Sequence, residues 1–320
     1  VDLSGFEVRG LALGAAARAE LLAIATRRAA PDLATAAMLR KVFRRRPPAS
    51  LIAPWDGEPH GRLTVSLARE AGVRTLVLAH GAFLLPQTLA DMEVCDEPLL
   101  WSEAVAPPIA DRDRPIHVVG YPMPHMRPPP TRPAPRGPRR RVLVLGQPTL
   151  SGTLLDDPRI TMRQYDVAVR AVLDRCPSAT LVLRPHPAEG PDAAAAIVAR
   201  FRALDFEIDR ATPIADALAA CDLCIGTITT ATLQAALVGT PVVALNLTRF
   251  EWRWPLGGDT TVPVARDQRQ LADWLARWEA GGPLPGRDDL LGALGASVEG
   301  ADPTASILAV VAGEGAPASG

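Results

Sequence analysis

The sequence predicts an α/β protein built from two doubly wound domains. Short apolar segments alternate with amphipathic ones along most of its 320 residues, a pattern typical of parallel sheets flanked by helices. The length is ample for two domains of about 150 residues each. Between the halves, residues 126–141 read MRPPPTRPAPRGPRRR, which has the proline-dense composition of an extended linker. We therefore expect a first domain over 1–125, a linker over 126–141 and a second domain over 142–320.

The first half alternates helical and apolar segments. Residues 11–30 are rich in Ala, Leu and Arg and predict a helix. The opening strand of a complete domain is missing, and the chain begins at Val1, so we expect an incomplete amino terminus. The expected strands are 50–55, 74–79, 98–101 and 116–119, with a helix over 61–71.

The second half alternates more regularly and ends in a frayed tail, GEGAPASG. Paired halves of this kind bind ligands in the cleft between them, at the carboxyl ends of the strands. The expected strands are 142–145, 179–183, 206–209, 223–226, 241–245 and 261–264. The expected helices are 162–174, 191–204, 214–220, 230–238, 268–280 and 301–313.

Composition excludes several classes of function. Lys and Arg total 34 against 35 for Asp and Glu, so no net field favours nucleic acid. No apolar run reaches the roughly 20 residues that span a bilayer, and no secretory signal is visible. Four scattered cysteines fit buried thiols in a reducing, cytoplasmic compartment, and no second pair completes a zinc site with the CDLC of 221–224.

The stretch LVLRPHPAEG, residues 181–190, predicts a strand that stops at two prolines. Arg184 and His186 follow the end of this strand, where open α/β sheets bind ligands. Both side chains can donate to a phosphate, and Pro187 helps to fix the turn. The alternative is a polar turn that only ends the strand.

A second anion-binding pattern, GTITTAT, runs from Gly226 to Thr232. It follows a strand and opens a helix, so free backbone N–H groups, the helix dipole and hydroxyls converge there. Thr227, Thr229 and Thr230 are the candidate ligands, although plain N-capping by one of the last two explains part of the pattern. Gly146 and Gln147 follow the first strand of the same half and could contact the same ligand.

The first half offers candidates for acid–base chemistry. Asp56 and Glu58 lie on a turn after the strand 50–55, and His80 follows the strand 74–79, with Gly81 next to it. A solvated turn is the alternative for the two acids.

Five segments, taken in their order along the chain, resemble GT-B-fold transferases of bacterial surface carbohydrate assembly. That group includes sialyltransferases and polysialyltransferases, Kdo transferases and CDP-glycerol glycerophosphotransferases. The resemblance covers most of residues 50–247. It is carried by WDGEPHGRLTVSLAREAGVRTLVLAHG, PLLWSE, IHVVGYP, VLRPHP and DLCIGTITTATLQAALVGTPVVALN.

The resemblance implies a metal-independent glycosyltransferase that needs no cofactor. His186 with Pro187, and Thr229 with Thr230, match the positions that bind the donor's phosphate. Asp56, with Glu58 as a neighbour, or His80 matches the base, and the two possibilities stay open. The threonine motif stands where those groups have serine, and DGE replaces two acids before a glycine.

The resemblance also implies the substrates. A CMP-linked acidic sugar is the preferred donor, with CDP- and UDP-linked donors open, and the acceptor is a surface glycan or glycolipid. Such an enzyme works at the inner face of the membrane, so peripheral membrane association is also open. The alternatives are a sugar-nucleotide 2-epimerase of the same fold and a non-catalytic sugar-nucleotide-binding subunit.

Overall fold

The structure is a computed structural model of the whole chain, and it divides into two compact units that are described one at a time. The described residues are 7–8, 11–12, 14–54, 56–57, 59–79, 92–102, 113–120, 139–146, 158–187, 189, 191–227, 229–248, 262–284 and 302–313.

A four-stranded sheet of order β3-β4-β5-β6 organises the amino-terminal part. The registered pairs β3–β4 and β5–β6 are parallel, as the alternating pattern predicts. The strands are β3 (Ser50–Ala53), β4 (Arg74–Leu78), β5 (Glu97–Leu100) and β6 (His117–Val118), and helix α2 (Pro59–Glu70) connects β3 to β4. Two short strands, β1 (Glu7–Val8) and β2 (Leu11–Ala12), pair separately and antiparallel.

Helix α1 (Gly14–Arg45) is much longer than the predicted segment 11–30. The helix continues through Pro31 because the following residues, again rich in Ala, Leu and Arg, favour helix on the far side. Beyond Pro31 the helix packs on α2, where Ala36 and Phe43 meet Leu67 in a small core. This contact fixes the second half of α1 to the sheet.

A six-stranded parallel sheet forms the carboxy-terminal part, in the order β12-β11-β10-β7-β8-β9. Its first strand, β7, lies between the second and the fourth, which is the order of a doubly wound nucleotide-binding domain. The strands are β7 (Arg141–Leu145), β8 (Thr180–Arg184), β9 (Glu207–Ile208), β10 (Leu223–Gly226), β11 (Val242–Leu245) and β12 (Val264–Ala265).

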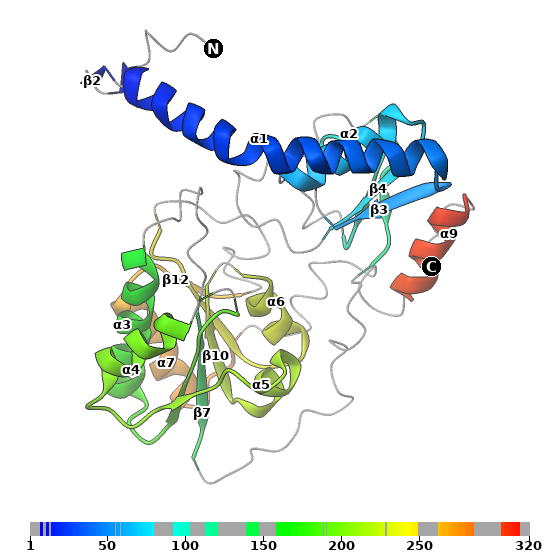
Figure 1. The fold of residues 1–320 in the computed structure, drawn as a ribbon. Coiled ribbons are helices and arrows are strands. Elements are labelled where there is room, and N and C mark those ends of the chain that lie inside the picture. Colours follow the sequence, from blue (N-terminus) through cyan, green and yellow to red (C-terminus); the bar gives the residue numbers. More distant parts are fainter. Residues whose placement is uncertain are drawn as a thin grey trace. The chain divides into compact units, whose positions relative to one another are not determined.

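Helices cover both faces of this sheet (Figure 1). Helix α3 packs against α7 on one face, with α4 beside them, and α5 packs against α6 on the other. The bounds are α3 (Pro158–Arg175), α4 (Pro191–Phe201), α5 (Ile214–Ala220), α6 (Thr230–Leu237) and α7 (Gln268–Glu279), and the chain has a last described helix, α9 (Pro303–Ala312). The elements expected in this half are confirmed, with shifts of one to four residues at most ends.

Strands β10 and β11 are buried along their whole length, because helices exclude water from both faces of the sheet. Their residues are aliphatic apart from Cys224 and Gly226. All four cysteines are buried and free, which confirms the predicted buried thiols. The domain boundaries at 125 and 141 stay a prediction.

Candidate functional site at the carboxyl edge of the second sheet

The strand order creates a ready-made binding position between β7 and β10. Helices leave these two neighbouring strands toward opposite faces, so their carboxyl ends diverge there, at the topological switch point of the sheet. Val144 pairs with Ile225, and continuing this register by two residues places Gly146 opposite Thr227. On the other side, Gly146 N donates to Arg184 O over 2.8 Å, which brings the Pro185–Pro187 turn alongside. Three sequence motifs thus meet at one edge.

Gly146 is required by the close approach of α3 to this edge. A Cβ at this position would lie 2.1 Å from the hydroxyl oxygen of Tyr165, whose side chain is buried at 1% exposure. The Tyr165 hydroxyl donates to Arg184 O over 3.4 Å, and burial raises the pKa of this phenol above its usual range. The absent side chain therefore lets the Tyr165 hydroxyl pack against the backbone at 146.

The threonine motif is folded around Thr227. Thr232 Oγ1 donates to Thr227 O over 2.6 Å, and Thr229 Oγ1 lies 3.3 Å from Thr232 Oγ1. Thr227 itself is 2% exposed, and its Oγ1 has no hydrogen-bond partner among the described residues. A buried hydroxyl of this kind is costly unless a ligand or water satisfies it.

Helix α6 begins at this motif without a side-chain cap. Thr229 is the N-cap residue, but its side chain makes no capping hydrogen bond, and Thr230 is the first residue of the helix. The N-capping alternative for these threonines is therefore wrong. Free N–H groups at a helix amino terminus attract anions. Anion binding at this end of α6 stays a prediction.

The turn after β8 places His186 at the same edge. Pro185 is buried, His186 is half-buried, and burial lowers the pKa of the imidazole. Glu189 N donates to His186 O over 2.9 Å, which closes the turn and folds Glu189 back toward the strand end. Sequence reasoning passed over Glu189, although it stands three residues after the histidine in the stretch that predicted the site.

Arg184 already has partners of its own. Its Nη1 lies 2.7 Å from Asp209 Oδ2, its Nη2 donates to Thr212 O over 2.7 Å, and its side chain is 11% exposed. Arg184 thus joins the end of β8 to the loop after β9. Its predicted contact with a phosphate stays untested, and both terminal nitrogens are occupied in this arrangement.

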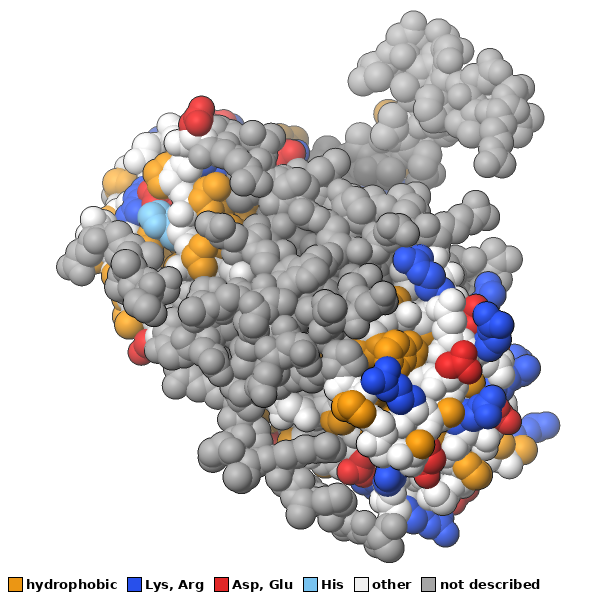
Figure 2. All heavy atoms as spheres, turned by 180° about the vertical axis from the view of Figure 1, so that it is seen from behind, with side chains coloured by type: hydrophobic (Ala, Val, Ile, Leu, Met, Phe, Trp, Pro, Cys, Tyr) orange, Lys and Arg blue, Asp and Glu red, His pale blue; other side chains and the backbone are white. Residues whose placement is uncertain are grey.

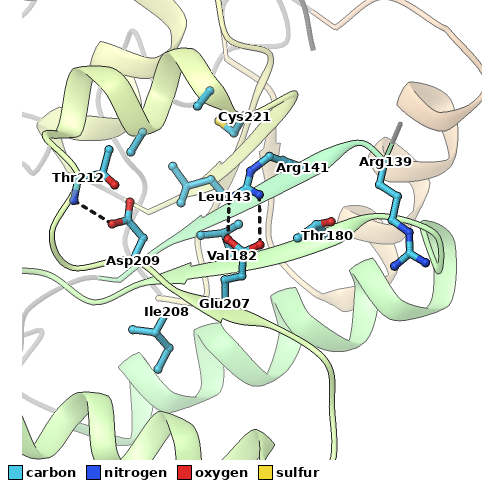
Figure 3. Close-up of a pocket in the computed structure, with 12 residues that line it drawn as sticks. Arg139, Arg141, Leu143, Thr180, Val182, Glu207, Ile208, Asp209, Thr212 and Cys221 are labelled. Carbon is cyan, nitrogen blue, oxygen red and sulfur yellow. Dashed lines mark hydrogen bonds and ion pairs between the residues drawn. The ribbon is translucent and has the colours of Figure 1, made fainter. Parts of the chain in front are cut away.

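A pocket of about 580 Å³ lies elsewhere, on the sheet face between β7, β8, β9 and helix α5 (Figure 3). Its polar groups satisfy one another: Arg141 forms a two-pronged ion pair with Glu207, at 3.2 and 2.7 Å, and Asp209 accepts from Thr212 N. A ligand would have to break these pairs, and the pocket is lined partly by residues near the amino ends of the strands. We assign it no function.

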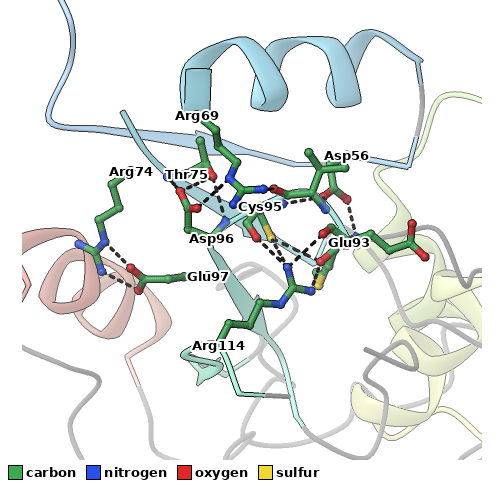
Figure 4. Close-up of polar contacts among 11 residues, drawn as sticks. Asp56, Arg69, Arg74, Thr75, Glu93, Cys95, Asp96, Glu97 and Arg114 are labelled. Carbon is green, nitrogen blue, oxygen red and sulfur yellow. Dashed lines mark hydrogen bonds and ion pairs between the residues drawn. The ribbon is translucent and has the colours of Figure 1, made fainter. Parts of the chain in front are cut away.

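In the amino-terminal part, the structure gives Asp56 an unexpected role (Figure 4). Its side chain is fully buried, and its carboxylate accepts from the backbone N–H of Met92, of Val94 at 3.0 Å and of Cys95 at 3.2 Å. Met92 has a left-handed backbone, with φ 61°, and Arg114 also donates to Met92 O. Asp56 therefore holds an unusual loop in place, and these contacts leave its carboxylate poorly available as a base.

Three predicted residues, Glu58, His80 and Gln147, lie outside the described residues. Within the described ranges, no group of three or more His, Cys, Asp or Glu side chains is placed to hold a metal ion. No helix in the described part of the chain is both long and apolar enough to cross a membrane.

No protein-family model matches the sequence, and no curated protein matches it significantly. Solved structures do match in fold. A Listeria monocytogenes protein assigned as a UDP-N-acetylglucosamine 2-epimerase has a TM-score of 0.59 at 13% identity, over 88% of this chain and 78% of that one. S. aureus MnaA, solved with UDP, has a TM-score of 0.61 at 10% identity, over 88% and 79%.

This chain has the GT-B fold. The GtfA/B complex is a further match, with a TM-score of 0.50 at 12% identity over 87% of this chain and 60% of that one. The GT-B fold confirms the predicted class of two Rossmann-like α/β domains. At these identities the likeness extends to the fold alone. Any activity of this chain depends on the side chains that it places on the GT-B scaffold.

Proposed function

We propose that this protein is a metal-independent glycosyltransferase that transfers a sugar from a nucleotide-activated donor to a glycan or glycolipid hydroxyl. The observation that carries the proposal is the switch point of the second sheet. There the buried Thr227 hydroxyl has no described partner and α6 begins without a side-chain cap, at the same strand ends that carry Gly146 and His186. The fold supports the same conclusion, since MnaA was solved with UDP.

The hydrogen-bond donors at this edge of the sheet suit the leaving group of such a transfer. Departure of a nucleotide phosphate leaves negative charge that N–H and O–H donors can stabilise without a metal. His186, half-buried, can add a proton or a hydrogen bond to the same phosphate. Gln147 and Pro187 flank this phosphate position in the proposal, and Thr229 and Thr230 complete it.

The acceptor hydroxyl needs a base from the amino-terminal part. Asp56, Glu58 and His80 are the candidates, and the three backbone donors on Asp56 favour His80 over it. Substitution of the true base is expected to lower the rate roughly a hundredfold or more and to preserve donor binding.

The nucleotide is best identified by binding. A thermal-shift panel of CMP, CDP, UDP and GDP is run on the wild-type protein and on two variants, His186→Ala and Thr227→Val. We expect one nucleotide to raise the melting temperature of the wild type and to do so much less in both variants. Thr240→Val serves as the control and should keep the shift, because it removes a buried threonine hydroxyl that precedes the amino-terminal end of β11, opposite to the carboxyl ends of the strands. Binding by no nucleotide, or equal shifts in all four proteins, would overturn the proposal.

The preferred donor is a CMP-linked acidic sugar, and UDP- and CDP-linked sugars are the alternatives that the panel separates. A 2-epimerase is the second candidate function, favoured by the TM-score of 0.59 to the protein assigned to that activity against 0.50 to the GtfA/B complex. Incubation with UDP-N-acetylglucosamine alone distinguishes the two, because an epimerase needs no acceptor. A non-catalytic binding subunit would show the thermal shift and no turnover with any acceptor.

Membrane association is part of the proposal and rests on α1. Residues 33–49 contain no acidic side chain, carry the basic residues Arg40, Lys41, Arg44, Arg45 and Arg46, and expose Leu33, Met38 and Val42. Basic side chains interleaved with apolar ones suit an anionic lipid surface. On the face drawn in Figure 2, by contrast, basic and acidic side chains are interspersed over the described surface, which does not favour nucleic acid.

Sedimentation with vesicles tests this part. The protein should bind vesicles that contain phosphatidylglycerol and not vesicles of phosphatidylcholine alone, and Arg44→Gln with Arg45→Gln should weaken binding. Arg269→Gln with Arg277→Gln on α7 is the charge-matched control. Equal binding by both double variants would remove the role of α1. A cytoplasmic location at the inner face of the membrane is part of this proposal.

A further inference from the structure

Glu189 is a buried carboxyl group at the candidate site that the proposed function has not used. It lies between β8 and α4, and its backbone is held at both ends of the residue: N donates to His186 O over 2.9 Å, and O accepts from Arg210 Nη2 over 3.3 Å. Both carboxylate oxygens are buried and neither makes a hydrogen bond of good geometry within the described residues, although the His186 backbone lies close enough to lower the pKa of the carboxyl. Structural carboxylates in folded proteins are normally paired, so this one calls for an explanation.

Burial raises the pKa of Glu189 to about 7, because the charged form loses its hydration. The backbone of His186 and the charge of Arg210 act in the opposite direction but do not overcome burial. The other titratable group at this position is Tyr165 of α3, whose own pKa is raised first by burial and then by the charge of Glu189. Glu189 therefore changes charge near neutral pH, next to His186.

We propose that Glu189 binds the donor in its neutral form and donates its proton in a hydrogen bond to a donor oxygen, so that binding is coupled to uptake of one proton. This inference rests on the proposed function. A neutral carboxyl can donate to a phosphate or sugar oxygen, whereas an ionised one repels an anionic donor. An anion nearby also favours the protonated form further, so above pH 7 each binding event takes one proton from the solvent.

The test measures affinity for a nucleotide sugar between about pH 6.5 and 8.5. The probe is UDP-N-acetylglucosamine, or the CMP-linked sugar if the panel selects CMP. In both, every phosphate is esterified and none ionises in this range. For the wild type we expect the dissociation constant to rise toward tenfold per pH unit above the pKa of Glu189. The same anion also favours protonation of His186, whose pKa in the free protein is lowered by burial, and the Glu189→Gln variant separates the two groups because it keeps His186.

Two variants separate the possible roles of the carboxyl. Glu189→Gln keeps a donor without a titrating proton, so its affinity should stay flat with pH and exceed that of the wild type at pH 8.5. Glu189→Met should also be flat, but weaker than the wild type at pH 6.5, because the hydrogen bond is lost. Melting curves at each pH confirm that both variants are folded.

Calorimetry in two buffers of different ionisation enthalpy gives the proton count directly. We expect about one proton taken up by the wild type at pH 8 and about none by Glu189→Gln. If the wild type and Glu189→Gln share one pH profile and one proton count, the inference fails and the proposed function stands. If no nucleotide sugar binds the wild type at any pH, the proposed function fails and takes this inference with it.

Discussion

Gly146→Ala is the most direct test of how α3 is fitted to the strand end. The added methyl would lie 2.1 Å from the Tyr165 hydroxyl oxygen and 3.2 Å from Arg184 O. The tyrosine is 1% exposed, so it cannot swing into solvent to relieve the overlap. Overpacking by one methyl in a close-packed interior costs about 1–3 kcal/mol. For a domain of this size that corresponds to a fall in melting temperature of roughly 2–4 °C per kcal/mol.

The collision is with one atom, so a second substitution should relieve it. Tyr165→Phe alone should cost only about 0.5 kcal/mol, because its hydrogen bond is long at 3.4 Å. Gly146→Ala with Tyr165→Phe should be more stable than the sum of the single effects, by about 1 kcal/mol. Urea unfolding of the four proteins, followed by circular dichroism, measures this coupling.

Gly239→Ala supplies a matched control. Gly239 has φ +80° and no atom within 4 Å of its Cβ position, so alanine there meets backbone strain and no collision. Its cost should add to that of Tyr165→Phe without coupling. Additive behaviour of Gly146→Ala with Tyr165→Phe, or a Gly146→Ala protein as stable as the wild type, would refute the packing argument.

Three further outcomes are expected. Asp56→Ala should lose about 3 kcal/mol or more in urea unfolding, since three backbone N–H groups lose their acceptor, and a variant of wild-type stability would contradict the structural role. Thr229→Ala should cost under about 0.5 kcal/mol, because the Thr229 side chain makes no capping bond to α6. Asp267→Ala should cost about 1 kcal/mol, because the Asp267 side chain caps α7 by accepting from Gln270 N at 2.8 Å. Equal losses of stability in the two variants would refute the comparison. Burial opposes ionisation of Asp209, but hydrogen bonds from Thr212 and Arg184 outweigh it and lower its pKa, so its stabilisation should be present above about pH 4 and be lost as the pH falls below that. Asp209→Asn should be less stable than the wild type at pH 7, and the difference should shrink in acid; a difference that is constant with pH would count against the ion pair.

The strands of the second sheet could be predicted because they are local signals. Strands β7, β8, β10 and β11 are mainly aliphatic, and the first three end at or just before a glycine or a proline. Helices of suitable length separate most of the strands. Once the strands are known to be parallel, their carboxyl ends share an edge, so Gly146, His186 and Thr227 could be brought together without a structure.

Contacts between distant segments could not be predicted in this way. Asp56 meets Met92, which is 36 residues further along the chain, and Arg184 meets Asp209 across a helix and a strand. In the sequence, Asp56 and Arg184 both look like unpaired polar residues at the end of a strand. Whether either side chain is available to a ligand depends on its contacts with distant parts of the chain, which no local sequence pattern reveals. Glu189 is the converse case, because only its burial distinguishes it from a solvated loop residue.

The four enclosed cysteines have a practical consequence for studying this chain in solution. Burial, reinforced by the charge of Asp56, raises the pKa of Cys95 to about 12, and burial raises that of Cys176 to about 11 and that of Cys224 well above its usual value. Thiol reagents attack thiolates, so the native sulfurs should stay almost silent toward maleimides under native conditions. One engineered surface cysteine in each unit would then accept a fluorophore selectively. Energy transfer between the two dyes could report whether adding a nucleotide sugar changes their separation, with no need to remove any native cysteine first.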